Sequence, residues 1–278
     1  MRLALYPLAL ASLTLPATAI AIAQTATQTP AQTAPPAQQT VVHTRDGGTS
    51  GRMESIVIPP VAGAPFTLTL VTEWSRPLGN GGSFTLANQR RIARDSRGRI
   101  YGERWVLVPK GSKIPSYMDV LQITDPALHT WHNCIVREKI CDLYAYAGST
   151  EKVYKPAIGV SGPLPDGNGF HQHEELGVSS TAGVNTTGYR ETTTLNAGVI
   201  GNDQPMVTTR EFWYAAQLGI NLISKVDDPQ SGKQVFTVKD LTTSEPEPSL
   251  FNLPEGFKIV DHIHEAESAQ TPGTQGHN

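Results

Sequence analysis

Two closely spaced histidine pairs have the residue type and spacing that best fit a chemical site. The first pair is His171 and His173, and the second is His262 and His264. Residues two apart on a strand point to the same face, so each pair can present two imidazole nitrogens to one metal ion. Four nitrogens from both pairs would suit zinc or copper. We expect instead that both pairs are solvated residues at loop or strand ends and that the chain holds no cofactor, with the metal site as the alternative.

Motifs of the common enzyme classes are absent from the sequence. It contains no Gly-x-Ser-x-Gly nucleophile elbow, no P-loop, no dinucleotide-binding glycine fingerprint after a strand and no Cys-x-x-Cys pair. A hydrolase triad scattered along the chain stays open, because its members need not be near in sequence. We predict no catalytic residue and expect a non-enzymatic protein. A metal-dependent enzyme that uses the histidine pairs is the alternative.

The two cysteines, Cys134 and Cys141, have the spacing of a cross-strand pair. Directly paired residues of a hairpin have a constant sum of residue numbers, so a reversal midway between the cysteines sets them opposite each other. A four-residue loop from Val136 to Lys139 would make them a non-hydrogen-bonded pair, in which side chains are closer, whereas a two-residue loop would make them a hydrogen-bonded pair. We expect a disulfide, with two free thiols or metal ligation as alternatives.

Aromatic side chains form the candidate ligand groove. The residues assigned to it are Trp74, Trp105, Trp213 and Phe212, because aromatic rings commonly line apolar ligand sites. The alternative is that these rings fill the core of a large sheet.

Several arginines lie close together on the hairpin predicted from residues 83–94 and 99–108. This basic run contains Arg90, Arg91, Arg94, Arg97, Arg99 and Arg104. These residues could bind an anionic group. Since acidic residues are interleaved with them, the other interpretation is a solvated hairpin face.

The first 23 residues have the layout of a secretory signal peptide. Arg2 gives a short positive start, and the run from Leu3 to Ala23 carries no charge. The run ends in Ala-Ile-Ala, a small-x-small pattern, so cleavage is expected before Gln24. An uncleaved membrane anchor is the alternative, because the run is nearly long enough to span a bilayer. Export to an oxidising compartment favours the disulfide.

Composition divides the rest of the chain. Residues 24–40 contain Thr, Gln, Pro and Ala without charge and are expected to be a disordered linker, as is the tail at 268–278. Residues 41–267 are predicted to form a single β domain, and the 25 glycines and 21 prolines fit a turn-rich β protein. The net charge of −3 is too weak to indicate a nucleic-acid partner.

Period-two alternation predicts about ten strands and no long helix. A short helical turn is expected at Leu250 to Pro254, and a loop from Gly159 to Gly169. Many antiparallel strands in sequential order indicate a strongly curved meander, which must close on itself, hold a ligand or pack on a partner. The strands are expected at residues 66–74, 83–94, 99–108, 121–124, both sides of the cysteine hairpin, 189–195, 207–214, 221–226 and 234–241.

Several runs resemble those of a group of uncharacterised exported bacterial proteins. They include Ile123-Thr-Asp-Pro126, Gly188-Tyr-Arg-Glu-Thr192 and Arg210-Glu-Phe-Trp-Tyr214. The closing stretch, with Leu250-Phe251 before Pro254-Glu-Gly-Phe257, is similar to proteins related to the outer-membrane lipoprotein carrier superfamily. This resemblance implies a half-barrel of antiparallel strands whose concave side is apolar, which in the carriers holds lipid acyl chains. It implies no catalytic residue.

Leader and resemblance together predict an extracytoplasmic protein, periplasmic or extracellular. It is expected to bind an apolar or lipid-like ligand, or an envelope protein, on the concave face. No nucleic acid is an expected partner, and no membrane span is expected once the leader has been removed.

Overall fold

The computed structural model describes residues 56–150, 156 and 158–263. The chain divides into two units, Met1–Gly48 and Thr49–Asn278, and every described residue belongs to the second. The predicted leader, linker and C-terminal tail lie outside the described residues, as does His264. None of the helical segments in the described ranges has the length and apolar character needed to cross a membrane.

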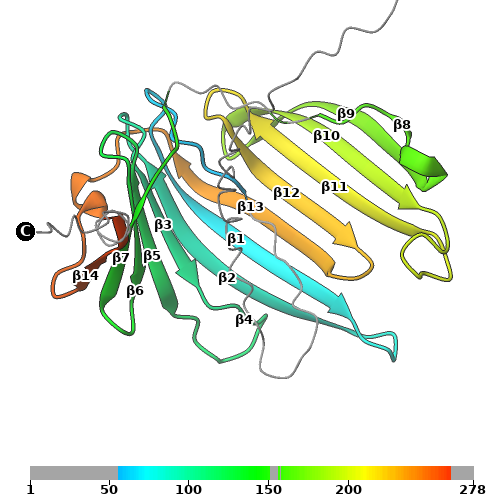
Figure 1. Cartoon of the computed structure of the whole chain (residues 1–278), viewed down its shortest axis with the longest axis horizontal. Helices are drawn as coiled ribbons and strands as arrows, with labels where there is room; N and C mark the ends of the chain where they lie inside the picture. Colours follow the sequence, from blue (N-terminus) through cyan, green and yellow to red (C-terminus); the bar gives the residue numbers. More distant parts are fainter. Residues whose placement is uncertain (1–55, 151–155, 157, 264–278) are drawn as a thin grey trace, which may run out of the picture. The chain divides into compact units, whose positions relative to one another are not determined.

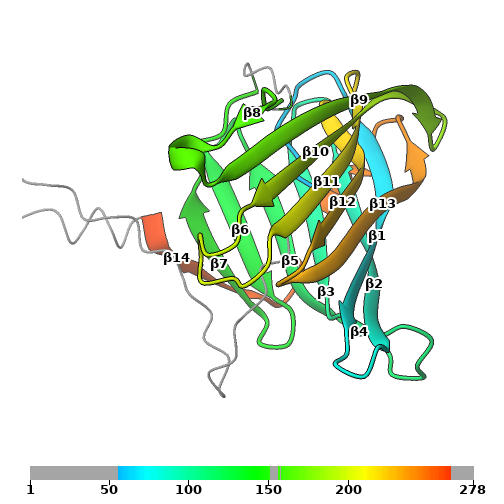
Figure 2. The ribbon, with the colours of Figure 1, turned by 90° about the vertical axis from the view of Figure 1, so that its right-hand side faces the viewer.

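The described residues form one curved, open sheet of 14 strands (Figures 1 and 2). In chain order the elements are β1 (Phe66–Pro77), β2 (Ser83–Arg94), β3 (Ile100–Trp105), β4 (Val108–Pro109), β5 (Met118–Asp125), β6 (Thr130–Ile135), β7 (Ile140–Ala145), β8 (Gly162–Pro163), η1 (Pro165–Gly167), β9 (Gly169–Thr181), β10 (Val184–Leu195), β11 (Met206–Ala215), β12 (Ile220–Asp228), β13 (Gly232–Thr242), η2 (Pro248–Phe251) and β14 (Lys258–Asp261). The predicted mainly-β class and curved antiparallel sheet are confirmed. The longest helical element in the described ranges, η2, has four residues.

The strand order differs from the sequential meander that the sequence predicted. From β1 the chain adds strands up to β7 at one side, then crosses to the other edge and returns from β8 to β13. β13 pairs antiparallel with β1, with Val238 opposite Leu70, so the two arms of the sheet meet at a central seam. β14 joins β7 in parallel at one edge. The local turn signals could not reveal the seam, because it joins segments far apart in sequence.

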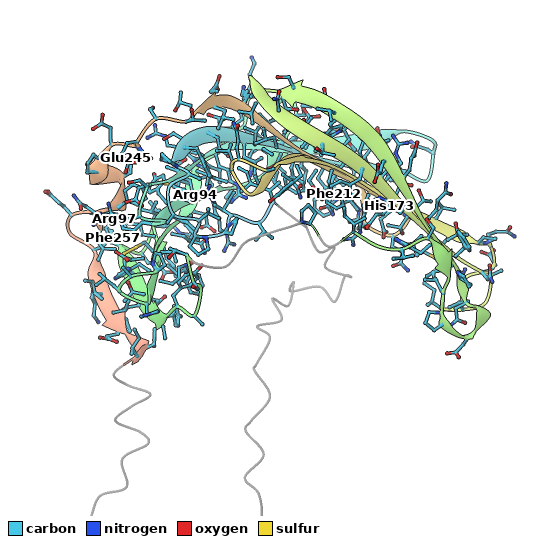
Figure 3. The ribbon with its side chains drawn as sticks, turned by 90° about the horizontal axis from the view of Figure 1, so that it is seen from above. Arg94, Arg97, His173, Phe212, Glu245 and Phe257 are labelled. Carbon is cyan, nitrogen blue, oxygen red and sulfur yellow. A yellow bond between two sulfur atoms is a disulfide. The ribbon has the colours of Figure 1, made fainter. Side chains whose placement is uncertain are left out.

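The inner, concave face carries an apolar cluster at one end of the seam. Figure 3 shows Arg94, Phe212 and His173 on this side of the sheet. Strands β1, β12 and β13 supply most of the cluster, because their alternate residues are apolar and buried. Ile56 and Ile58, which precede β1, pack against it. The buried members are Ile56, Phe66, Leu68, Leu70, Ile92, Val184, Ala215, Leu218, Ile220, Leu222, Phe236 and Val238.

The outer, convex face carries a second cluster, which the C-terminal segment covers. Phe251 of η2 is buried in it, and the Arg99 guanidinium lies 4.4 Å from the centre of the Phe251 ring. Glu245 and Phe257 lie on this outer side (Figure 3). The predicted helical turn near Leu250 therefore exists, as η2, and attaches the chain end to the sheet. The other buried members are Ala93, Tyr101, Leu121, Ile123, Cys134 and Cys141.

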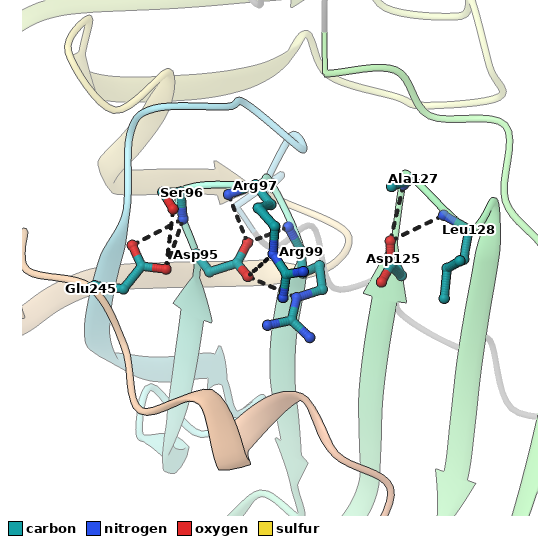
Figure 4. A network of polar contacts seen from close by, with 8 residues as sticks. All are labelled: Asp95, Ser96, Arg97, Arg99, Asp125, Ala127, Leu128 and Glu245. Atoms are coloured by element: carbon teal, nitrogen blue, oxygen red, sulfur yellow. Dashed lines mark hydrogen bonds and ion pairs between the residues drawn. The ribbon is translucent and has the colours of Figure 1, made fainter.

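The turn between β2 and β3 is fixed by two carboxylates (Figure 4). The buried Asp95 carboxylate accepts hydrogen bonds from the backbone N–H groups of Arg97 and Arg99 and from the Arg99 guanidinium, at 3.1, 2.8 and 2.7 Å. Glu245, which follows β13, accepts from the backbone N–H of Ser96. The C-terminal segment is thereby attached to this turn.

The predicted disulfide is present. Cys134 and Cys141 lie opposite each other on β6 and β7, are joined by a bond, and are both fully buried. The connecting loop runs over residues 136–139, as the four-residue alternative requires. Spacing and loop length therefore identified this pair correctly.

The double substitution Cys134→Ala/Cys141→Ala should lower the free energy of unfolding by about 2 kcal/mol, because the bond closes a short loop. Urea unfolding with and without reductant measures the effect. Reductant should destabilise the wild type by a similar amount and leave the variant unchanged. A variant as stable as the oxidised wild type would contradict this expectation.

Candidate functional site

A cavity opens on the inner face where β2 and β3 separate. Their backbone pairing covers only Ile92–Arg94 of β2, and β2 pairs next with β4, at Leu86 and Ala87. Between these points side chains bridge the gap. The Arg90 guanidinium donates to the carbonyl of Glu103 at 3.2 Å, and the Asn88 amide donates to the carbonyl of Trp105.

This cavity has a volume of about 500 Å³. Its lining combines apolar and polar groups, a composition that suits an amphipathic ligand. The side-chain oxygen of Asn88 is buried and has no hydrogen-bond partner among the described residues. The lining residues are Thr72, Asn88, Arg90, Arg104, Trp105, Val106, Leu107, Asp119 and Phe236. A smaller cavity of about 240 Å³ shares Arg90 and reaches Gln122, Thr124 and Tyr146.

Two arginines from adjacent strands give the larger cavity its charge. Arg90 is half-buried and Arg104 is exposed, and Asp119 is the one acidic residue of the lining. Burial and the nearby Arg104 charge lower the pKa of Arg90 to about 10, so Arg90 stays protonated at neutral pH. Two positive groups and one carboxylate leave the lining cationic. The sequence had offered anion binding by this basic run as one of two alternatives.

The predicted groove aromatics divide between the two faces. The Trp105 indole N–H donates to the Glu103 carboxylate at 2.7 Å, and the Trp213 indole N–H donates to Glu211 at 3.1 Å. Both carboxylates belong to the outer face. Glu103 lies opposite Leu121 of the outer cluster, and Glu211 directly precedes Phe212, which lies on the inner face, in β11. In each Glu-x-Trp sequence the tryptophan therefore shares the outer face with the glutamate.

Trp74 and Phe212 lie on the inner face. The Trp74 indole N–H donates to the carbonyl of Ser231, and the Phe212 ring lies 5.4 Å from that of Tyr189. The structure thus does not bring the four aromatic residues into one groove. Trp105 contributes to the cavity lining, and its carbonyl is bonded to Asn88 there.

The inner face is not uniformly apolar, unlike the face that the resemblance implies. Its apolar end is covered by the protein's own residues before β1, whose Pro59 and Ala64 carbonyls are bonded to Arg94. Polar side chains occupy much of the remainder, including Gln122, which bonds to Asn133. A ligand on this face therefore meets mixed chemistry.

His171 and His173 lie on β9, towards one end of the sheet order, whereas His262 directly follows β14 at the other end. His171 and His173 share the inner face of β9, and the His171 ring bonds to Thr193 at 3.1 Å. His262 follows β14, bonds to Asp142 at 2.9 Å and stacks on the ring of Tyr144. The described residues therefore do not form the four-nitrogen site, and no group of three or more metal-binding side chains occurs in the described ranges.

A scan against protein-family models and a search of curated proteins found no match. Among solved structures, the chain is similar to an uncharacterised conserved protein from Thermus thermophilus, with 9% identity and a TM-score of 0.36 over 72% of this chain and 91% of that one. It is similar to MucB of Pseudomonas aeruginosa, solved with MucA, at 14% identity and a TM-score of 0.35, over 70% of this chain and 58% of that one. It is also similar to the lipoprotein LppX of Mycobacterium tuberculosis, at 13% identity and a TM-score of 0.28, over 69% of this chain and 91% of that one.

MucB and LppX have lipoprotein-carrier-like folds, the group that the sequence resembles. The chain spans 58% of the MucB chain. At these identities and TM-scores the likeness extends to neither family nor function.

Proposed function

We propose that this chain is a non-enzymatic, exported protein that binds an amphipathic small molecule on the inner face of its sheet. The observation that carries the proposal is the cavity of about 500 Å³ between β2 and β3. Ligand sites are typically concave, with apolar walls and a few placed polar groups. Here Val106, Leu107 and Phe236 supply the apolar part, while Asn88 and the two arginines supply the polar part.

The leader sequence and the disulfide support the exported location. Arg2 and the uncharged run to Ala23 have the layout of an export signal. Disulfides persist in oxidising compartments, and the Cys134–Cys141 bond is buried.

Native mass spectrometry of protein purified from the cell envelope without detergent tests the proposal. The wild type should carry a bound amphiphile, and its mass should correspond to a chain that begins at Gln24. Leu107→Glu should reduce ligand occupancy about tenfold or more, because the ligand would meet an unpaired carboxylate in the cavity wall. Ile114→Glu is the matched control, because Ile114 is an exposed residue of the following loop that does not line the cavity.

Protein that is isolated empty should still bind the neutral apolar dye N-phenyl-1-naphthylamine, with the same loss in Leu107→Glu. The proposal is wrong if the wild type neither carries a ligand nor binds the dye, or if both glutamate variants behave alike.

A further inference from the structure

We propose that the inner-face cavity recognises an amphiphile by its anionic head group, a phosphate or carboxylate, which Arg104 binds directly with Arg90 beside it. The inference rests on the proposed function and names the class of ligand. It is carried by the backbone register, the charge of the cavity and its mixed lining.

The backbone itself sets the two arginines on one face. β2 and β3 pair with Ile92 opposite Gly102 and Arg94 opposite Ile100. The same antiparallel register, continued past the point where the strands separate, places Arg90 opposite Arg104. Both residues line the cavity, and Arg90 is bonded to the carbonyl of Glu103 next to Arg104. Their proximity is therefore a property of the hairpin.

The Arg104 charge has no ion pair or hydrogen bond among the described residues. The neighbouring carboxylate, Glu103, lies on the outer face, where it accepts from the Tyr101 hydroxyl, the Trp105 indole and the backbone N–H of Arg91. It cannot serve the inner face at the same time. A guanidinium can give a phosphate or carboxylate two parallel hydrogen bonds, which makes Arg104 well suited to an anion.

The groups beside the arginines fit the rest of an amphiphile. Phe236 is buried at the cavity, and Val106 and Leu107 line it, so an alkyl chain finds apolar contacts there. The buried side-chain oxygen of Asn88 has no hydrogen-bond partner among the described residues and can accept from a hydroxyl of the head group. An anionic head and an apolar chain are thus accommodated side by side.

Isothermal titration calorimetry with three amphiphiles and with inorganic phosphate tests the inference. The amphiphiles are octyl phosphate, octanoate and neutral octyl glucoside, each used below its critical micelle concentration. Octyl phosphate and octanoate should bind at least about tenfold more tightly than octyl glucoside, as expected for one charge-assisted contact. Arg104→Gln should remove most of that preference. Arg91→Gln is the matched control, since Arg91 is an exposed arginine on the outer face of β2, and it should leave the preference unchanged.

The outcomes separate this inference from the proposed function. If all three octyl compounds bind with equal affinity, or if Arg104→Gln and Arg91→Gln have the same effect, head-group recognition is overturned while ligand binding stands. If inorganic phosphate binds as tightly as octyl phosphate, the site is one for a free anion and the inference is also overturned. If no octyl compound binds to the wild type, the proposed function itself fails.

Discussion

Replacement of Arg94 by methionine should lower the free energy of unfolding by about 4 kcal/mol. The Arg94 side chain is fully buried. Its guanidinium donates to the carbonyls of Ala64 at 2.8 and 3.0 Å, Pro59 at 2.8 Å and Leu218 at 2.6 Å. It also lies 4.8 Å from the centre of the Phe66 ring. Methionine keeps an apolar stem but leaves these three carbonyls without their donor.

Urea unfolding of three variants measures this effect. Arg94→Lys keeps the charge but cannot reach three carbonyls at once, so it should lose an intermediate amount. Arg97→Met is the control, because the Arg97 side chain is largely exposed and pairs with Asp95 at 3.5 Å, and ion pairs of exposed side chains contribute little. Limited proteolysis of Arg94→Met should cleave first in the segment before β1, which the guanidinium holds. An Arg94→Met protein within about 1 kcal/mol of the wild type would contradict the argument.

Acid should remove about 3 kcal/mol of stability through Glu211 alone. Burial of the Glu211 carboxyl opposes its ionisation, but hydrogen bonds from Lys225, Arg190 and Trp213 outweigh burial and lower its pKa from 4.5 to about 2. The Lys225 and Arg190 contacts are 2.8 and 2.9 Å long, and the carboxylate side chain is only 14% exposed. Arg190 also reaches Glu174, so the network joins β9, β10, β11 and β12 on the outer face.

The sign of the pH dependence follows from the lowered pKa. The folded state binds the proton of Glu211 more weakly than the unfolded chain, so the contribution is complete above pH 4.5 and is lost as the pH falls towards about 2. Unfolding of wild type and Glu211→Gln should differ by about 3 kcal/mol at neutral pH and converge in acid. Glu174→Gln, which removes one exposed ion pair, should differ from wild type by less than about 1 kcal/mol throughout. A constant difference between wild type and Glu211→Gln at every pH would refute the assignment.

Local features of the fold followed from the sequence. The strand Ser83–Arg94 was predicted with the bounds that the structure shows, and the turn after it was marked by Asp95 and Gly98. Asp95 fixes that turn by accepting from backbone N–H groups, and Gly98 has a φ of 84° there, which favours glycine. The cysteine hairpin followed from residue numbers alone. In each case the determining interactions lie within a few residues.

The sequence analysis did not predict strands that lack a continuous apolar face. β9, the longest strand, has His171 and His173 half-buried on one face and Gln172 and Glu174 exposed on the other. Period-two hydrophobicity cannot detect such a strand, because neither face is apolar. β8 and η1 likewise fall inside the stretch that was expected to be a loop. The β7–β14 pairing was not predicted either, since its partners are far apart in sequence.

The site was only partly predictable, because the predicted groove was assigned from the aromatic residue types and not from the strand face on which each residue lies. Phe212 and Trp213 are both aromatic, yet consecutive residues of a strand face opposite sides, so one groove could not contain both rings. The repeated Glu-x-Trp sequence was the signal for Trp105 and Trp213. Arg90 and Arg104 could have been paired by counting outwards from the turn at Asp95 to Gly98. Thr72, Asn88 and Phe236 carry no distinctive signal and needed the fold.

The seam between β1 and β13 also determines when during synthesis the sheet around β1 can be completed. β1 is among the first strands to be synthesised, whereas its partner β13 begins only at Gly232. Until then one side of β1 is an open edge with unpaired backbone groups, which can pair with other chains. A chain that is cut short before Gly232 keeps that edge exposed. Pairing of β13 with β1, rather than formation of the first hairpins, is therefore the step that closes this edge.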